Sequence, residues 1–332
     1  MTEETGMNRR RLLLSLAAVA VGAAAVARPA VAQAFPPKGP VNLVVGFAAG
    51  GAADTAARLI AKKLGDNLGH SVVVQNRAGA GGNIAHKLVA DAEPDGATIL
   101  LGSIGPLAIA PHLMQLPYDP ERDLAPLTMG VNFPNVLVVH PGLDVKTLAQ
   151  FIALAKAKPR ELTYASTGAG SASHLAGEMF NQRAGVEVVH VPYKGGSQAM
   201  VDLLSGRVSA YYSTPSTAAP HVQAGKLVAI ATTGLERPSF QADIPTIAES
   251  GFEGFNATNW YAFVAPARTP EAILKRWNEE LVKALHAPDV REQLLNIGLI
   301  PAPGSREALR DFIAKESATW AQVIRERKIT AE

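Results

Sequence analysis

The stretch that decides the fold is residues 41–58, which read VNLVVGFAAGGAADTAAR. A short run of strand character, Val41–Val45, enters a glycine-rich turn, and apolar residues at helical spacing follow from Ala53 to Leu68. A strand, a glycine turn and a helix start expose backbone N–H groups at the positive end of a helix dipole. The stretch therefore predicts an anion-binding turn, with a simple chain reversal as the alternative.

This first loop, residues 47–53, looks like a phosphate-binding P-loop without its functional side chains. Gly46 and Gly51 have the required spacing, but Ala52 and Ala53 stand where a lysine and a hydroxyl-bearing residue should be. Because the cationic contacts for a triphosphate are missing, a carboxylate fits better. For Asp54 the alternative role is to favour the first helical turn electrostatically.

A second loop of similar design, residues 166–174, reads STGAGSASH and leads into a helix expected from about Leu175 to Arg183. Ser173 stands where a dinucleotide fingerprint has its third glycine, so a nucleotide is not predicted. Neutral hydrogen-bonding side chains gather instead at this second helix start. They are Ser166, Thr167, Ser171, Ser173 and His174. Helix capping alone is the alternative for each serine.

Short β-branched runs alternate with helical stretches along most of the chain. After the first run, the expected strands are Ser71–Gln75, Thr98–Leu101, Val136–Val139, Leu162–Ser166, Val186–Val191, Val208–Tyr212 and Leu227–Thr232. From Pro270 the chain is mainly helical and ends in a long helix over Arg306–Arg327. This order predicts α/β layers with mainly parallel sheets. Crossings near Pro134 and Phe255 would divide it into a domain of residues 35–135 plus 256–332 and an inserted domain of residues 136–255.

The net charge of the chain lies in its first 34 residues. The 332 residues carry 31 Lys+Arg and 29 Asp+Glu. Four arginines and two glutamates fall within residues 1–34, which leaves 27 basic and 27 acidic groups in the remainder. A neutral body with only 6% aromatic residues lacks the charge and the stacking platforms that nucleic-acid binding needs. No nucleic-acid partner is expected.

Residues 1–34 have the pattern of an export signal. Arg9–Arg11 precede the apolar run Leu12–Ala27, which is shorter than the roughly 20 residues of a membrane span. The paired arginines and the alanine-rich run resemble a twin-arginine signal. Cleavage is expected after Ala32 or Ala34, which would place the mature protein in the periplasm. An uncleaved membrane anchor is the alternative.

Two enzymatic chemistries find weak support in the sequence. The closest approach to a nucleophile elbow, Gly195–Ala199, has alanine in its last position. The eight histidines form no metal-binding pair of the H-x3-H or H-E-x-x-H type, and the chain has no cysteine. No metal and no cofactor are therefore expected. An exported hydrolase that uses Ser171 or Ser173 with His174 stays open as an alternative.

Several further motifs follow the first loop in a characteristic order. They are Asn76-Arg77, Gly79-Ala80-Gly81-Gly82-Asn83, Pro94-Asp95-Gly96, Leu116-Pro117-Tyr118-Asp119-Pro120, His190-Val191-Pro192-Tyr193-Lys194-Gly195, Pro245-Thr246 and Trp260 before Ala265-Pro266. Together with the two loops, they resemble the substrate-binding proteins of tripartite tricarboxylate transporters, the Bug family. The resemblance covers essentially the whole chain after the leader. One departure is Ala48, where the family often has proline.

The resemblance implies an α/β fold of the type II periplasmic binding protein class, or Venus flytrap. Two α/β domains, joined by two crossing segments, would close on a ligand in the cleft between them. The implied protein is a monomeric receptor, not an enzyme, that delivers its ligand to integral membrane permease subunits. The ligand would be a small carboxylate: a di- or tricarboxylate, an amino acid or an aromatic acid. A sensor or partner protein that works without transport is the alternative.

The expected ligand-binding residues come mainly from the two loops. They are Phe47, Ala48, Ala49, Gly50, Gly51, Ala52, Asp54, Ser103, Ser166, Thr167, Gly168, Ser171, Ser173, His174 and Tyr193.

Overall fold

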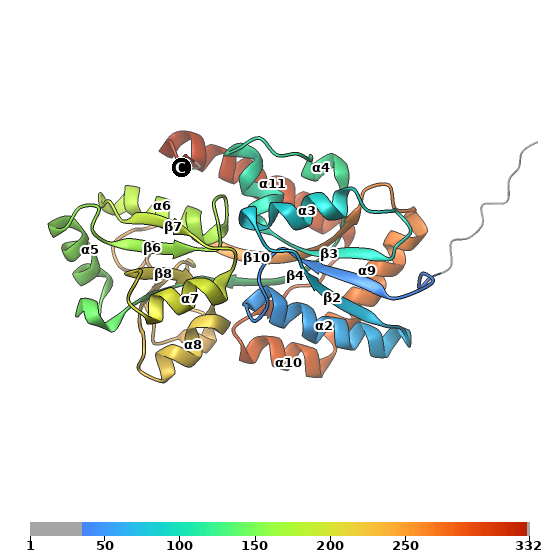
Figure 1. Cartoon of the computed structure of the whole chain (residues 1–332), viewed down its shortest axis with the longest axis horizontal. Coiled ribbons are helices and arrows are strands. Elements are labelled where there is room, and N and C mark those ends of the chain that lie inside the picture. Colours follow the sequence, from blue (N-terminus) through green and yellow to red (C-terminus); the bar gives the residue numbers. More distant parts are fainter. Residues whose placement is uncertain (1–34, 331–332) are drawn as a thin grey trace, which may run out of the picture. The chain divides into compact units, whose positions relative to one another are not determined.

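The computed structural model describes residues 35–330, which form two β-sheets flanked by helices (Figure 1). The predicted leader, residues 1–34, lies outside the described residues. Among residues 35–330, no helix combines the length and hydropathy needed to cross a bilayer.

The first sheet has six strands in the order β11-β4-β10-β3-β1-β2. These strands are β1 (Val41–Val45), β2 (Val72–Asn76), β3 (Thr98–Ser103), β4 (Leu124–Pro134), β10 (Thr258–Pro266) and β11 (Ile300–Pro301). The helical segments around it are α2 (Ala52–Leu68), η1 (Ala80–Gly82), α3 (Asn83–Ala90), η2 (Gly105–Ile109), η3 (Ala110–His112), α4 (Pro120–Asp123), α9 (Glu271–His286), α10 (Pro288–Asn296) and α11 (Arg306–Arg327). Helices α9 and α11 both pack against β4. The C-terminal helices thus return to this sheet, and together these elements are called the first lobe.

The second sheet has five strands in the order β7-β6-β8-β5-β9. These strands are β5 (Val136–Val139), β6 (Thr163–Ser166), β7 (Val189–Pro192), β8 (Ala210–Ser213) and β9 (Val228–Thr232). Its helical segments are η4 (Pro141–Leu143), α5 (Leu148–Ala157), α6 (Ala172–Ala184), α7 (Gly196–Leu204), α8 (Pro215–Gln223) and η5 (Ser239–Gln241). These elements are called the second lobe.

The prediction of mainly parallel sheets is wrong, because both sheets are mixed. Strand β1 pairs in parallel with β2 and β3, and β6 does so with β7 and β8. However, β10 runs antiparallel to β3 and β4, and β5 runs antiparallel to β8 and β9. A helical crossover returns the chain in the same direction, which makes neighbouring strands parallel. Strands that arrive from the other lobe are free of that constraint.

Buried apolar side chains hold α2 against the first sheet. Its small residues Ala53 and Ala57 and its larger Ile60 and Leu64 are all buried. The helix ends where Gly69 adopts a left-handed conformation, with φ of 59°. Because α2 is fixed along its length, its N-terminus and the preceding first loop keep a defined position at the carboxyl end of β1.

Three chain segments meet where the lobes join. Strand β4 of the first sheet ends at Pro134. Asn135 follows it, and β5 of the second sheet begins at the next residue, Val136. The backbone N–H of Thr233 donates to the carbonyl of Asn135 at 2.9 Å, and the N–H of Ala257 donates to the carbonyl of Thr233 at 2.9 Å. The Thr233 hydroxyl also joins both neighbours, since it accepts from the Asn135 N–H and donates to the Ala257 carbonyl. Asn135 is therefore held firmly between the lobes.

Candidate functional site

A narrow cleft lies between the two lobes, lined by residues of both. All the space between its atoms, including open solvent at the mouth, amounts to about 490 Å³. The cavity volume available to the centre of a water-sized molecule is only about 30 Å³. Sites for small molecules usually offer roughly 300–1,000 Å³. The lobes are thus closed on each other, and a metabolite-sized ligand requires movement of the lobes or of the lining side chains.

Seven of the residues predicted from the sequence line this cleft. They are Phe47, Gly51, Ala52, Ser103, Thr167, Ser171 and Ser173. The other eight do not line it; they are Ala48, Ala49, Gly50, Asp54, Ser166, Gly168, His174 and Tyr193. Some of these eight residues lie at the rim of the cleft, where the lobes touch. The others lie behind the two loops and support them.

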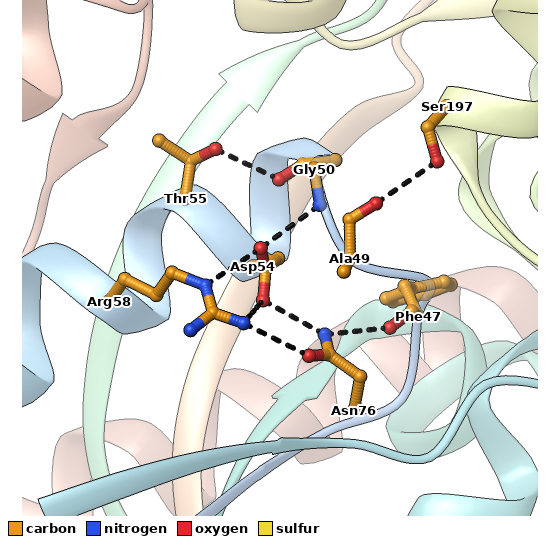
Figure 2. A network of polar contacts seen from close by, with 9 residues as sticks. Phe47, Ala49, Gly50, Asp54, Thr55, Arg58, Asn76 and Ser197 are labelled. Atoms are coloured by element: carbon orange, nitrogen blue, oxygen red, sulfur yellow. Dashed lines mark hydrogen bonds and ion pairs between the residues drawn. The ribbon is translucent and has the colours of Figure 1, made fainter.

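Asp54 lies underneath the first loop and connects it to α2 and β2 (Figure 2). Its carboxylate accepts hydrogen bonds from the backbone N–H of Gly50 at 3.0 Å and from Asn76 Nδ2 at 2.9 Å. Arg58, one turn further along α2, donates to the same carboxylate through Nε at 3.0 Å. Asn76 also donates to the carbonyl of Phe47 at 3.1 Å. Asp54 therefore fixes the conformation of the loop, and its oxygens are occupied.

The network keeps Asp54 ionised although it is buried. Burial by itself would raise the pKa of this carboxyl, but the hydrogen bonds from Arg58, from the Gly50 amide and from Asn76 outweigh it and lower the pKa. A lowered pKa in the folded state means that the carboxylate stabilises the fold fully above its unfolded-state pKa. This stabilisation is lost as the pH falls through the folded-state pKa.

Replacing Arg58 by alanine is expected to leave ligand binding largely intact. Its side chain is 55% exposed and does not line the cleft. An exposed ion pair contributes about 0–1 kcal/mol, so the free energy of unfolding should fall by no more than that. Isothermal titration calorimetry should give a dissociation constant within about threefold of the unchanged protein.

The matched control for Arg58→Ala is Lys63→Ala. Lys63 lies on the same helix and pairs with Asp289, with its Nζ 2.9 Å from the carboxylate, away from the loop. Both variants should behave alike. If Arg58→Ala alone abolished binding, the ligand would be held by a direct ion pair with Arg58, and a cleft of neutral donors would be the wrong account.

The second loop folds back on its own hydroxyl groups. Ser171 is the N-cap of α6, and its Oγ accepts from the backbone N–H of His174 at 3.3 Å. Ser173 Oγ accepts from the backbone N–H of Thr167 at 3.0 Å and lies 3.1 Å from Ser171 Oγ. Ser171 thus caps the helix and lines the cleft at once, so the two interpretations of this residue are compatible.

Two stacked histidines support the second loop from below. The rings of His174 and His190 lie 4.2 Å apart between centroids. Burial lowers the pKa of His174 to about 3 and that of His190 to about 4. His174 Nδ1 accepts from the N–H of Gly170 at 3.2 Å, and His190 Nε2 lies 2.5 Å from Ser166 Oγ. The neutral ring of His174 therefore serves the loop backbone, and Ser166 belongs to the same support.

Tyr193 also points away from the cleft. Its hydroxyl donates to Asp202 Oδ2 at 2.8 Å within the second lobe. Burial, together with Asp202, raises the pKa of Tyr193 to about 12. This tyrosine remains neutral and anchors the segment that leads into α7.

The remaining predicted residues lie at a rim where the lobes touch. Ser197 Oγ, on α7, donates to the carbonyl of Ala49 at 3.2 Å (Figure 2). A Cβ atom placed on Gly195 would lie 2.9 Å from the Cβ of Ala48, and one placed on Gly168 would lie 2.7 Å from a backbone nitrogen of η1. The two lobes are in direct backbone contact at this rim.

Several lining residues were missed by sequence reasoning. They are Ile104, Gly105, Asn135, Gly196, Tyr211, Tyr212, Thr214, Thr217 and Asn259. Ala53 and Ala172 also line the cleft, and both lie within the two predicted loops. On β10, Tyr261 also lines the cleft, whereas its neighbour Trp260 donates its ring N–H to Glu316. The dipeptide Thr214-Pro215 could have predicted the position of Thr214, because it has the pattern of a helix start and directly follows a run of strand character.

Neutral groups make up the lining of the cleft. Among the described residues that line it, tyrosines are the only ionisable ones, and burial raises the pKa of both Tyr211 and Tyr261. The first turns of α2, α6, α7 and α8 all contribute lining residues. Helix N-termini present backbone N–H donors and positive dipole ends. The arrangement can hold an anion without a cationic side chain.

Comparison of the sequence with known proteins identifies its relatives. The family model described as tripartite tricarboxylate transporter family receptor matches residues 56–329. Protein BugT of Bordetella pertussis is 38% identical over 322 residues, which are 96% of this chain and 98% of BugT.

Solved structures agree with these sequence matches. Rpa4515 of R. palustris, solved with adipate, is 35% identical with a TM-score of 0.86, covering 90% of this chain and 99% of that one. MatC of Rhodopseudomonas palustris, solved with bound malate, is 31% identical with a TM-score of 0.83, covering 87% and 99%. The predicted two-lobed binding-protein fold is thereby confirmed. Since the family model spans most of the chain, this chain belongs to the tripartite tricarboxylate transporter receptor family.

Proposed function

We propose that the protein is an extracytoplasmic receptor that binds a small carboxylated metabolite in the cleft and delivers it to a tripartite tricarboxylate-type permease. The observation that carries this proposal is the closed, uncharged cleft onto which the starts of α2 and α6 open from different lobes. Backbone N–H groups and hydroxyls at two helix N-termini suit a carboxylate. Adipate and malate, the ligands of Rpa4515 and MatC, are both small dicarboxylates.

The mechanism is an equilibrium between open and closed forms. Residues 35–135 plus 256–332 act as one domain and residues 136–255 as the other, with the segments near Asn135 and Asn259 as hinges. A ligand that contacts both helix starts stabilises the closed form, because it gains interactions there that the open form lacks. The permease subunits then recognise the closed, ligand-loaded receptor.

The receptor works without catalysis. A hydrolase built on Ser171 or Ser173 would need the His174 ring as its base. His174 Nδ1 instead accepts the Gly170 N–H, and its ring stacks on His190. With a pKa of about 3, this imidazole is also a weak base. These contacts support a structural role for His174.

The receptor acts in the periplasm as a monomer. The leader directs its export, with cleavage after Ala32 or Ala34, and the mature chain meets its permease at the membrane surface. The mature part is formally neutral, so the ligand is selected by local geometry in the cleft and not by long-range attraction.

A thermal-shift screen tests the proposal. The panel contains mono-, di- and tricarboxylates, amino acids and aromatic acids. A true ligand at 100 times its dissociation constant adds about 2.7 kcal/mol to the stability of the protein, so the temperature of the unfolding transition should rise clearly. The methyl esters of the same acids are the matched control, because they keep the carbon chain and lose the charge. Absence of any shift across the acids, or equal shifts with the esters, would contradict carboxylate binding.

A further inference from the structure

Two buried polar groups of the cleft have no hydrogen-bond partner. Ser103 Oγ and Asn135 Nδ2 are both unpaired within residues 35–330, and both residues line the cleft. Ser103 is 3% exposed and Asn135 only 1% exposed. A buried donor left unpaired is costly and calls for a partner. The other unpaired groups of the described chain, such as Thr269 Oγ1, belong to residues that do not line this cleft.

The orientation of the Asn135 amide is fixed by its neighbours on β10. The backbone N–H of Trp260 donates to Asn259 Oδ1 at 2.8 Å, which leaves Asn259 Nδ2 as a donor. That group donates to Asn135 Oδ1 at 3.4 Å. Because Oδ1 of Asn135 accepts this bond, its Nδ2 must be the unpaired end. Asn135 therefore offers the cleft a donor and not an acceptor.

The two groups come from different parts of the fold. Ser103 is the last residue of β3 in the first lobe, and Asn135 lies in the segment between β4 and β5 that joins the lobes. Both are set apart in sequence from the two loops that form the anion-binding helix starts. A ligand held by its carboxylate at those helix starts could place a second polar group here.

We propose that Ser103 and Asn135 form a second subsite that donates hydrogen bonds to another oxygen of the ligand. This inference rests on the proposed carboxylate receptor and names its substrate class: acids that carry a second oxygen acceptor, a hydroxyl, an oxo group or a further carboxyl. A monofunctional aliphatic acid leaves both donors buried and unpaired, so it binds more weakly. The bond to Asn135 also ties the ligand to the segment that joins the lobes.

The experiment compares matched acids on matched variants by isothermal titration calorimetry. The probes are butyrate, 4-hydroxybutyrate and succinate, and hexanoate, 6-hydroxyhexanoate and adipate, which share chain lengths within each set. In the unchanged protein, bifunctional acids should bind at least about tenfold more tightly than the monofunctional acid of the same length. Ser103→Ala should remove about tenfold of that preference and leave the monofunctional acid unaffected.

Thermal unfolding without ligand separates recognition from a structural role. Because the Ser103 hydroxyl has no hydrogen-bond partner, Ser103→Ala should leave the temperature of the unfolding transition unchanged or raise it. Asn135→Asp keeps the acceptor for Asn259 and replaces the donor with an acceptor, so it should also lose the preference. Thr269→Val is the control, because it removes an unpaired hydroxyl that is 4% exposed and lies outside the cleft.

The outcomes distinguish this inference from the proposed function. If the unchanged protein bound none of the acids in this set or in the wider panel, carboxylate binding itself would fail, and the subsite with it. If it bound acids but did not prefer bifunctional ones, or if Ser103→Ala weakened every acid equally, only the subsite would be overturned. If Ser103→Ala lowered the temperature of unfolding without ligand, the Ser103 hydroxyl would have a structural partner, and the subsite would likewise be overturned.

Discussion

Asp54→Ala should lower the free energy of unfolding by about 3 kcal/mol and weaken carboxylate binding at least tenfold. The carboxylate holds three groups at once: the Gly50 N–H, Asn76 Nδ2 and the Arg58 guanidinium. The hydrogen bonds from the Gly50 N–H and Asn76 to this buried charge contribute about 1.5–3 kcal/mol each. The exposed Arg58 adds about 0–1 kcal/mol, and partial repair by water limits the total. Without these bonds, the first loop loses the conformation that directs its N–H groups into the cleft.

Chemical denaturation and calorimetry on Asp54→Ala and on Asp66→Ala measure the effect. Asp66 is an exposed aspartate near the other end of α2, so its replacement should change stability by at most about 0.5 kcal/mol. The difference between the unchanged protein and Asp54→Ala should also shrink on acidification below the unfolded-state pKa of 3.8, as the carboxylate becomes protonated. A stable Asp54→Ala variant with full affinity would mean that the loop orders itself without this carboxylate.

The two loops could be predicted because their information is local. A strand run, glycines and a helix start follow one another within about fifteen residues, and this order alone places backbone donors at a strand end. The same reasoning assigned Asp54 to the ligand, whereas its oxygens are used inside the loop. The partner that reveals this is Asn76, which lies on β2 and becomes a neighbour only when β1 and β2 pair.

The remaining lining could not be predicted because it depends on how the sheets meet. Asn135, Asn259 and Tyr211 are single residues in or beside strands, and no motif marks which side they face. Strand β4 itself was missed, since Pro126 and Gly130 interrupt its apolar run. Strand β4 pairs antiparallel with β10 and leads directly into Asn135, so this antiparallel pair and the position of Asn135 were missed together.

Gly195→Ala should weaken ligand binding by about thirtyfold while leaving the unliganded protein as stable as before. Gly195 has φ of 172°, an extended conformation open to any residue, so alanine brings no backbone strain. Its Cβ would, however, lie 2.9 Å from both the backbone nitrogen and the Cβ of Ala48 in the opposite lobe. Overpacking of this kind costs about 1–3 kcal/mol, and here it is felt only when the lobes close.

The backbone at Ala48 has little freedom to move aside. The first loop is anchored on one side by the Asn76 bond to the Phe47 carbonyl and on the other by the Asp54 bond to Gly50. The added methyl group must therefore reduce the population of the closed form, and the apparent dissociation constant rises in inverse proportion to that population.

Calorimetric titration with a carboxylate identified in the screen, alongside unfolding without ligand, measures both effects of Gly195→Ala. Gly304→Ala is the matched control, since a Cβ there meets no atom within 4 Å, and it should bind like the unchanged protein. Loss of affinity with unchanged stability identifies closure as the step affected, because a local folding defect would lower both. Unchanged affinity would instead mean that the ligand-bound form is more open at this rim, with the carboxylate enclosed mainly by side chains deeper in the cleft.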